Sequence, residues 1–156
     1  MKGALVDAEF IAKTGRAAEE SFASGLYCAE SVVLAVAKAR GLESDILPRV
    51  ATGFCTGMSR TCGTCGALTG AIMGIGLALG RDEAGRSVEP CYEATQRMIA
   101  EFEHEFGSGN CRDLLGCDLG TPEGQASFRE DDLIVRCARF TRRAAEMAIR
   151  LVGQHG

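Results

Sequence analysis

The chain has 156 residues, of which 46% are hydrophobic and 24% are charged, and its formal net charge is −4. This length fits one domain with a core of its own, so we expect a single domain over residues 1–156. The small negative charge, with no basic arm in the sequence, argues against a nucleic-acid partner.

Eight cysteines, about 5% of the residues, are fewer than the roughly 8–10% typical of a disulfide scaffold. Asp7 and Glu9 interrupt the first ten residues, where a secretory signal would need an apolar run. We therefore expect a cytoplasmic protein, whose thiols are kept reduced. Clustered cysteines in that compartment are more often metal ligands or redox thiols than structural bridges.

Apolar residues recur every three or four positions along most of the chain, which predicts helices rather than strands. In chain order, we expect helices at Leu5–Ala23 and Cys28–Arg40, a short turn at Ser44–Val50, a glycine-containing loop over 51–64, helices at Gly66–Leu79 and Val88–Phe106, a single turn at Cys111–Leu115, a helix start at Thr121–Pro122, and a final helix at Asp131–Val152. The predicted fold class is all-α, a bundle of about five helices with a central Gly-rich buried helix.

Gly66, Gly70 and Gly74 form a strip without side chains along one face of the predicted central helix. Each glycine costs about 0.5–1 kcal/mol relative to alanine, so the close approach of another group is the expected compensation. We favour tight helix packing as that compensation, and we retain Gly66 and Gly70 as candidate cofactor-binding positions.

The stretch from Thr61 to Gly80 carries no charge and is long enough to cross a bilayer. Its glycines, threonines and cysteines lower its hydrophobicity, and amphipathic segments flank it on both sides. We therefore expect a buried helix and no membrane span.

Three cysteines stand at or near predicted helix starts, where free N–H groups and the helix dipole lower the pKa of a thiol. They are Cys28, Cys65 and Cys111. Cys137 is flanked by Arg136 and Arg139, whose positive charges favour the thiolate in the same way. A thiolate is the form that binds metal or attacks a disulfide, so these four are the candidate functional thiols.

Cys62 and Cys65 are three positions apart, a spacing that suits one shared metal ion or one disulfide. No histidine directly follows Cys65, which excludes c-type haem attachment, and the lack of a second Cys-x-x-Cys argues against a zinc ribbon. Cys91 lies on the apolar stripe of its helix and is expected to act as a small buried hydrophobe. The roles of Cys55 and Cys117 stay open.

Several segments together resemble the redox-active protein family named for its C…GCAxxG…C…C pattern. They are Tyr27–Ser31, Gly57–Arg60, Cys65–Gly70, Asn110–Gly116 and Cys137, and their order covers the chain from about residue 20 to residue 150. The central segment reads Thr64-Cys65-Gly66-Ala67, a variant of the pattern in the family's name.

The resemblance implies that Cys28, Cys65, Cys111 and Cys137 are the four characteristic cysteines. The family is also similar to the C-terminal part of split-Soret cytochrome c, which carries an iron–sulfur centre. This similarity implies an all-helical redox module here, without the haem portion, and by analogy a homodimer.

Our first hypothesis is an electron-transfer module whose metal ligands are Cys28, Cys65, Cys111 and Cys137, with Cys62 or Cys117 as substitutes. Four thiolates suit a 2Fe-2S or a 4Fe-4S iron–sulfur cluster, and such a module needs an unidentified redox partner protein. A second hypothesis is a thiol–disulfide oxidoreductase, with Cys65 as the catalytic attacking thiolate and Cys62, or a more distant cysteine, resolving. A third is non-catalytic, either a structural zinc site or a helical dimer with buried cysteines.

Overall fold

The computed structural model describes residues 6–155, which form eight α-helices and one 3₁₀ helix. In chain order these are α1 (Ala8–Ala23), α2 (Cys28–Ala39), η1 (Arg49–Phe54), α3 (Cys55–Arg60), α4 (Gly66–Leu79), α5 (Glu89–Phe106), α6 (Cys111–Leu115), α7 (Pro122–Glu130) and α8 (Ile134–Gly153). Over this range the structure has no strand, and the only bridge joins Thr64 to Asn110. The predicted all-α class is confirmed.

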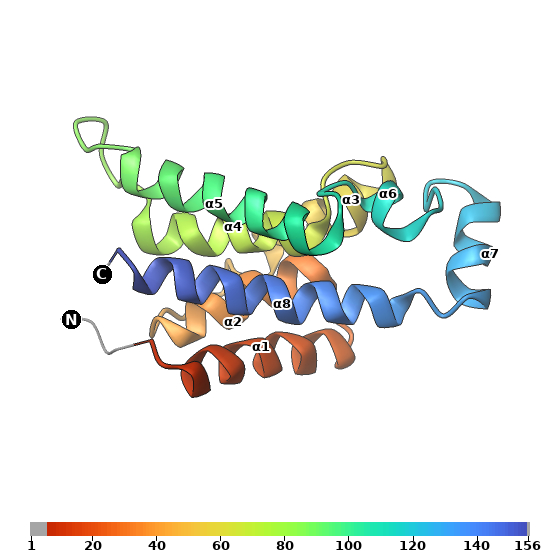
Figure 1. The fold of residues 1–156 in the computed structure, drawn as a ribbon, viewed down its shortest axis with the longest axis horizontal. Coiled ribbons are helices and arrows are strands. Elements are labelled where there is room, and N and C mark those ends of the chain that lie inside the picture. The colour runs from red at the N-terminus through yellow and green to blue at the C-terminus, as the bar shows by residue number, and fades with distance from the viewer. Residues whose placement is uncertain (1–5, 156) are drawn as a thin grey trace.

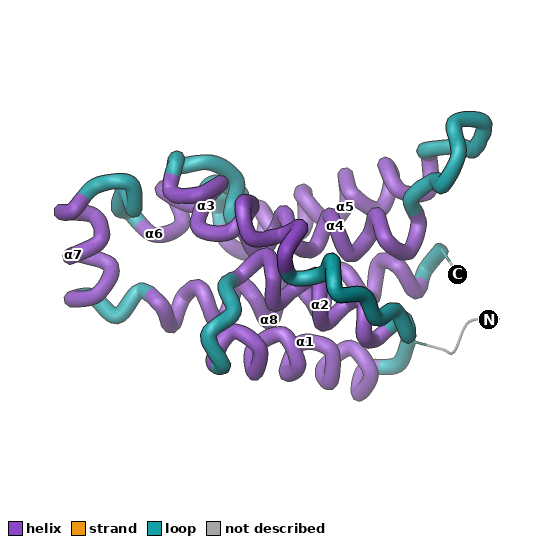
Figure 2. Tube along the Cα trace, turned by 180° about the vertical axis from the view of Figure 1, so that it is seen from behind, coloured by secondary structure: helices purple, strands orange, loops and turns teal. Residues whose placement is uncertain are grey.

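The five long helices, α1, α2, α4, α5 and α8, form the bundle, with α8 in its middle (Figure 1). Helix α8 packs against each of the other four, and α2 packs closely on α4. The start of α1 and the end of α8 lie at one end of the bundle, whereas α3, α6 and α7 lie at the opposite end, as the view from behind also shows (Figure 2). The short helices are therefore gathered away from these two helix ends.

Helix α4 is the predicted glycine-rich buried helix, although α8 and not α4 lies in the middle of the bundle. A β-carbon at Gly70 would stand 2.6 Å from the carbonyl oxygen of Ala29, and one at Gly74 would stand 2.8 Å from Cγ1 of Val36. Both glycines therefore let α2 pack against the backbone of α4, which is the compensation expected for glycine in a helix. Among the described residues, no helix is both long enough and apolar enough to cross a membrane.

The region predicted as a loop over 51–64 is more ordered than expected. It contains η1 and then α3, in which Thr56, Gly57, Met58 and Ser59 all have φ near +60° and ψ between 43° and 63°. These angles belong to a left-handed helical turn, which L-residues other than glycine rarely adopt. Three of these four residues are not glycine, so nothing in the local sequence indicates the turn.

Other helix boundaries moved by a few residues. The short turn of helix predicted at Ser44–Val50 is displaced along the chain: turns occupy 45–48, and the 3₁₀ helix η1 begins at Arg49. Helix α8 begins at Ile134 because Asp131 caps the preceding helix α7. The predicted start of the first helix at Leu5 lies outside the described residues, and α1 begins at Ala8.

Candidate functional site

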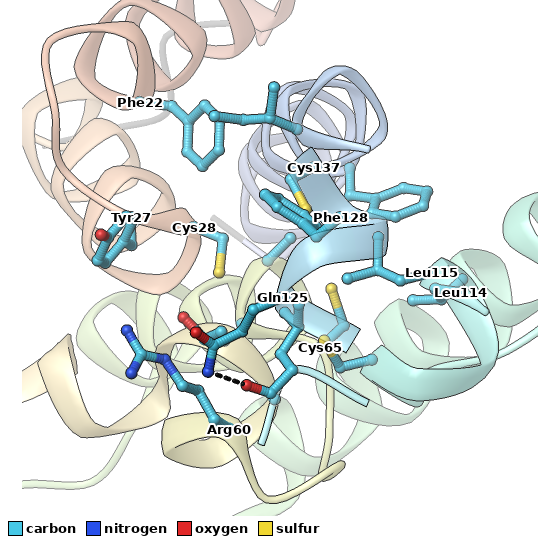
Figure 3. Close-up of a pocket in the computed structure, with 18 of the residues that line it drawn as sticks. Phe22, Tyr27, Cys28, Arg60, Cys65, Leu114, Leu115, Gln125, Phe128 and Cys137 are labelled. Atoms are coloured by element: carbon cyan, nitrogen blue, oxygen red, sulfur yellow. Dashed lines mark hydrogen bonds between the residues drawn. The ribbon is translucent and has the colours of Figure 1, made fainter. Parts of the chain in front are cut away.

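A cavity of about 270 Å³ lies at the end of the bundle that holds α3, α6 and α7. Its wall contains four cysteines, each contributed by a different helix or its N-cap: Cys28 of α2, Cys65 before α4, Cys111 of α6 and Cys137 of α8. Figure 3 shows the sulfur atoms of Cys28, Cys65 and Cys137 turned toward the same space. Most of the remaining wall is aromatic or aliphatic, and Arg60, Gln125 and Arg129 are among its polar members.

A short antiparallel bridge holds Cys65 beside Cys111. The backbone N–H of Cys65 donates to the carbonyl oxygen of Gly109 at 2.8 Å, and the N–H of Cys111 donates to that of Gly63 at 2.9 Å. Each cysteine then leads into a helix, Cys65 as the N-cap of α4 and Cys111 as the first residue of α6. Two thiols far apart in the sequence are thus fixed as neighbours by backbone hydrogen bonds.

Asn110 stabilises this arrangement. Its side-chain oxygen accepts from the backbone N–H groups of Arg112 at 3.0 Å and Asp113 at 3.3 Å, which caps α6. Its side-chain nitrogen donates to the carbonyl oxygen of Cys62 at 2.6 Å. One residue therefore caps the helix that begins at Cys111 and ties it to the segment before Cys65.

Cys28 reaches the cavity from the first turn of α2. The side chain of Glu30 accepts from the backbone N–H of Tyr27 at 2.7 Å and so fixes the start of this helix. The sulfur of Cys28 lies directly against Gly66, where a β-carbon would collide with it. Gly66 therefore lines the cavity beside the sulfur, whereas Gly70 is not part of the cavity wall and serves the packing of α2 on α4.

Burial controls the ionisation of three of the cavity thiols. It raises the pKa of Cys65 to about 11, against the lowering effect of the backbone N–H groups of Ala67 and Leu68. Burial raises the pKa of Cys111 to about 11 as well, and the pKa of Cys137 to about 12, and neighbouring cysteines add to both shifts. The expectation that the helix starts and the arginine neighbours would lower these values was therefore wrong, because loss of hydration outweighs them.

Cys62 does not pair with Cys65. The neighbouring carboxylate of Asp118 is the main cause that raises the pKa of Cys62, and Cys117 adds to this shift. Neither Cys62 nor Cys117 lines the cavity. The Cys-x-x-Cys spacing thus places its two thiols in different surroundings, since Cys62 precedes the bridge and Cys65 follows it.

Cys55 is a fifth thiol next to the site, and its position was not foreseen from the sequence. It is buried, and the neighbouring thiol of Cys28, ahead of burial, raises the pKa of Cys55 far above its usual range. Its thiol also lies 3.6 Å from the carbonyl oxygen of Ala51. Cys91, by contrast, packs against the main hydrophobic core and does not line the cavity, as expected.

Within residues 6–155, no group of three or more His, Cys, Asp or Glu side chains is arranged to hold a single metal ion. The four predicted ligands share a cavity and do not close on one point. Their role as ligands stays a prediction, as does the catalytic role of Cys65 and Cys62.

The family model described as "putative redox-active protein (C_GCAxxG_C_C)" matches residues 26–151. The chain belongs to this family. The matched range contains all eight cysteines and every helix from α2 to the greater part of α8. No curated protein and no solved structure shows significant similarity to the chain.

Proposed function

We propose that this redox-active protein is an electron-transfer module that holds an iron–sulfur cluster in the cavity through Cys28, Cys65, Cys111 and Cys137. The observation that carries the proposal is that these four thiols, from distant parts of the chain, line one cavity. Such a cluster, when bound, supplies one-electron transfer.

The chemistry of the four donors fits this group. Four thiolates are the usual ligands of both 2Fe-2S and 4Fe-4S clusters. Three of the four thiols have pKa values of about 11 or 12, so their thiolates are costly without a bound metal. A bound metal deprotonates its thiol ligands outright, because its positive charge replaces the lost hydration.

Other residues of the chain support the same role. The backbone N–H groups of Ala67 and Leu68 face the sulfur of Cys65 and stabilise negative charge on it. Phe140 and Leu115 are buried side chains of the cavity wall, which limit the access of water. The side chain of Arg60 adds a positive charge to a site that would collect negative charge.

The thiol–disulfide alternative has less support from the site. Its proposed attacking residue, Cys65, is only 6% exposed and has a pKa of about 11, whereas attacking thiols are accessible and ionised near neutral pH. Its proposed resolving residue, Cys62, faces Asp118 and lies outside the cavity wall. We infer that electron transfer to a separate redox partner protein is the better hypothesis; a cytoplasmic location and a homodimer stay predictions.

The experiment is purification without oxygen, followed by iron and acid-labile sulfide analysis and an absorption spectrum. The proposal expects a brown protein with about two or about four irons per chain, according to cluster type, and absorbance that dithionite bleaches. A colourless protein that takes up no iron and sulfide under these conditions, or that holds stoichiometric zinc, would overturn it. Oxygen must be excluded because exposed clusters decompose and leave disulfides behind.

A further inference from the structure

Cys55 stands directly behind one of the four cavity cysteines. It is only 3% exposed, does not line the cavity, and belongs to the smaller hydrophobic cluster against which Cys28 packs. Both residues pack against α4 at Gly66. A β-carbon at this position would collide with the sulfur of Cys28 and stand 3.1 Å from the α-carbon of Cys55. The two cysteines therefore lie side by side at a position of α4 that has no side chain.

The surroundings distinguish the two thiols. Cys28 is partly exposed and reaches the cavity from the first turn of α2. Cys55 is enclosed by Ala29, Ala51 and other apolar residues of the smaller hydrophobic cluster. A small oxidant in the cavity therefore meets Cys28 first, and Cys55 is the nearest thiol behind it.

We propose that Cys28 and Cys55 form a redox-active dithiol that a small peroxide entering the cavity oxidises to a disulfide. Once this disulfide has formed, Cys28 is no longer a free thiol and only three of the four proposed ligands remain. This consequence for cluster binding rests on the function proposed above.

The reaction balances with a peroxide as the oxidant. The sulfur of Cys28 attacks one peroxide oxygen, the O–O bond breaks, and hydrogen peroxide leaves one water and a sulfenic acid on Cys28. The sulfur of Cys55 then attacks the sulfur of Cys28; the S–S bond forms, the S–O bond breaks, and the hydroxide leaves as water with the proton of Cys55. Two thiols and one peroxide thus give one disulfide and two waters.

The positions of the other cysteines favour this pairing. Cys62 and Cys117 lie beside Asp118, outside the cavity wall, and Cys91 lies against the main core. Cys65 and Cys111 are fixed beside each other by the backbone bridge. Among these cysteines, Cys28 is the one that packs against the cluster containing Cys55.

The test treats the reduced, metal-free protein with hydrogen peroxide, alkylates the remaining thiols, and analyses a tryptic digest without reduction. Trypsin places Cys28 in a peptide of residues 17–38 and Cys55 in one of residues 50–60, each with a single cysteine. We expect these two peptides to be joined in the wild type and in Cys91→Ala. In Cys55→Ala they are not joined, and a dimedone probe labels Cys28 as a sulfenic acid.

Two results would overturn the dithiol. One is that peptide 17–38 stays fully alkylated after peroxide treatment, and the other is that it joins a peptide containing a different cysteine. The wild-type digest carries this test alone, so it does not depend on the folding of any variant.

A second arm separates this proposal from the cluster itself. The oxidised protein, offered iron and sulfide without oxygen, should take up neither until a thiol reductant opens the disulfide, whereas reduced Cys55→Ala takes them up as the wild type does. Uptake by the oxidised protein with its disulfide intact would contradict the withdrawal of Cys28. If the reduced wild type takes up no iron, the proposed function fails while the linked peptides still report on the dithiol.

Discussion

At the scale of single residues, burial decides the chemistry of the cavity cysteines. Cys65 is the N-cap of α4 and receives two backbone N–H groups, yet its pKa rises to about 11 because the thiolate would lose its hydration. The identity of the four cysteines could be predicted from the sequence, through the pattern that they share with the family. Their protonation could not, because exposure is a property of the fold.

The raised pKa values predict how the metal-free protein responds to pH. Below the ordinary thiol pKa of 9.0 both folded and unfolded chains keep the proton of Cys65, so its burial is not penalised. Between about pH 9 and pH 11 the unfolded chain releases this proton and the folded chain retains it, so the free energy of unfolding falls by about 2–3 kcal/mol.

Urea unfolding at several pH values measures this effect. Cys65→Ala should lose this part of the decline, and Cys91→Ala should retain it. Equal pH dependence in the wild type and Cys65→Ala would show that the Cys65 thiol is not held in its protonated form.

Gly66 and Gly76 provide a matched pair on the same helix. A methyl group at Gly66 would collide with the sulfur of Cys28 and stand 3.2 Å from the carbonyl oxygen of Phe54, whereas one at Gly76 meets nothing within 4 Å. We expect Gly66→Ala to destabilise the protein by about 1–3 kcal/mol and to reduce iron uptake. Gly76→Ala should be neutral or stabilise it by up to about 1 kcal/mol.

Chemical denaturation and iron content check both variants. An equal and favourable response to alanine at the two glycines would mean that Cys28 does not approach α4 as closely as described. A loss of iron in Gly76→Ala alone would be equally incompatible with the site.

At the scale of elements, the left-handed turn of α3 shapes the wall of the cavity. Thr56 and Gly57 line the cavity, and a β-carbon at Gly57 would stand 3.1 Å from the sulfur of Cys111. A β-branched residue such as Thr56, at φ 58°, is strained in this conformation. Strain of this kind persists only where the surrounding structure enforces it, which is common at functional sites.

Thr56 offers a direct measure of that strain. Thr56→Gly removes the clash of the side chain with its backbone, and Thr56→Ala removes most of the side chain but keeps a β-carbon. We expect the glycine variant to be more stable than the alanine variant by about 1 kcal/mol, since a left-handed residue costs roughly 1–2 kcal/mol when it is not glycine. Urea unfolding of the two proteins gives the difference, and a more stable alanine variant would argue against the left-handed turn.

The elements differed in how well the sequence predicted them. Helices α4 and α6 were predicted with their observed bounds, because Gly80 ends the first and Asn110 and Gly116 enclose the second. The segment over 51–64 was predicted as a loop, since its residues have no preference for left-handed angles. The contact between Cys28 and Cys55 depends on that segment, which is why it too was missed.

At the scale of the whole molecule, the bundle brings together residues that no sequence period relates. Helix periodicity predicted the class of fold and the glycine-rich buried helix α4, but it did not predict which helix ends would meet. Packing of α8 against α2 and α4, together with the bridge before α4 and α6, gathers the four cysteines at one end of the bundle. A site made in this way should depend on all four thiols at once.

Iron and sulfide content per chain, measured without oxygen in single cysteine-to-alanine variants, tests this claim most directly. Cys28→Ala, Cys65→Ala, Cys111→Ala and Cys137→Ala should each lose most of the bound iron and the visible absorbance. Cys91→Ala, a change outside the cavity, should keep wild-type values. Wild-type iron content in all four cavity variants, or an equal loss in Cys91→Ala, would contradict a cluster held by these four residues.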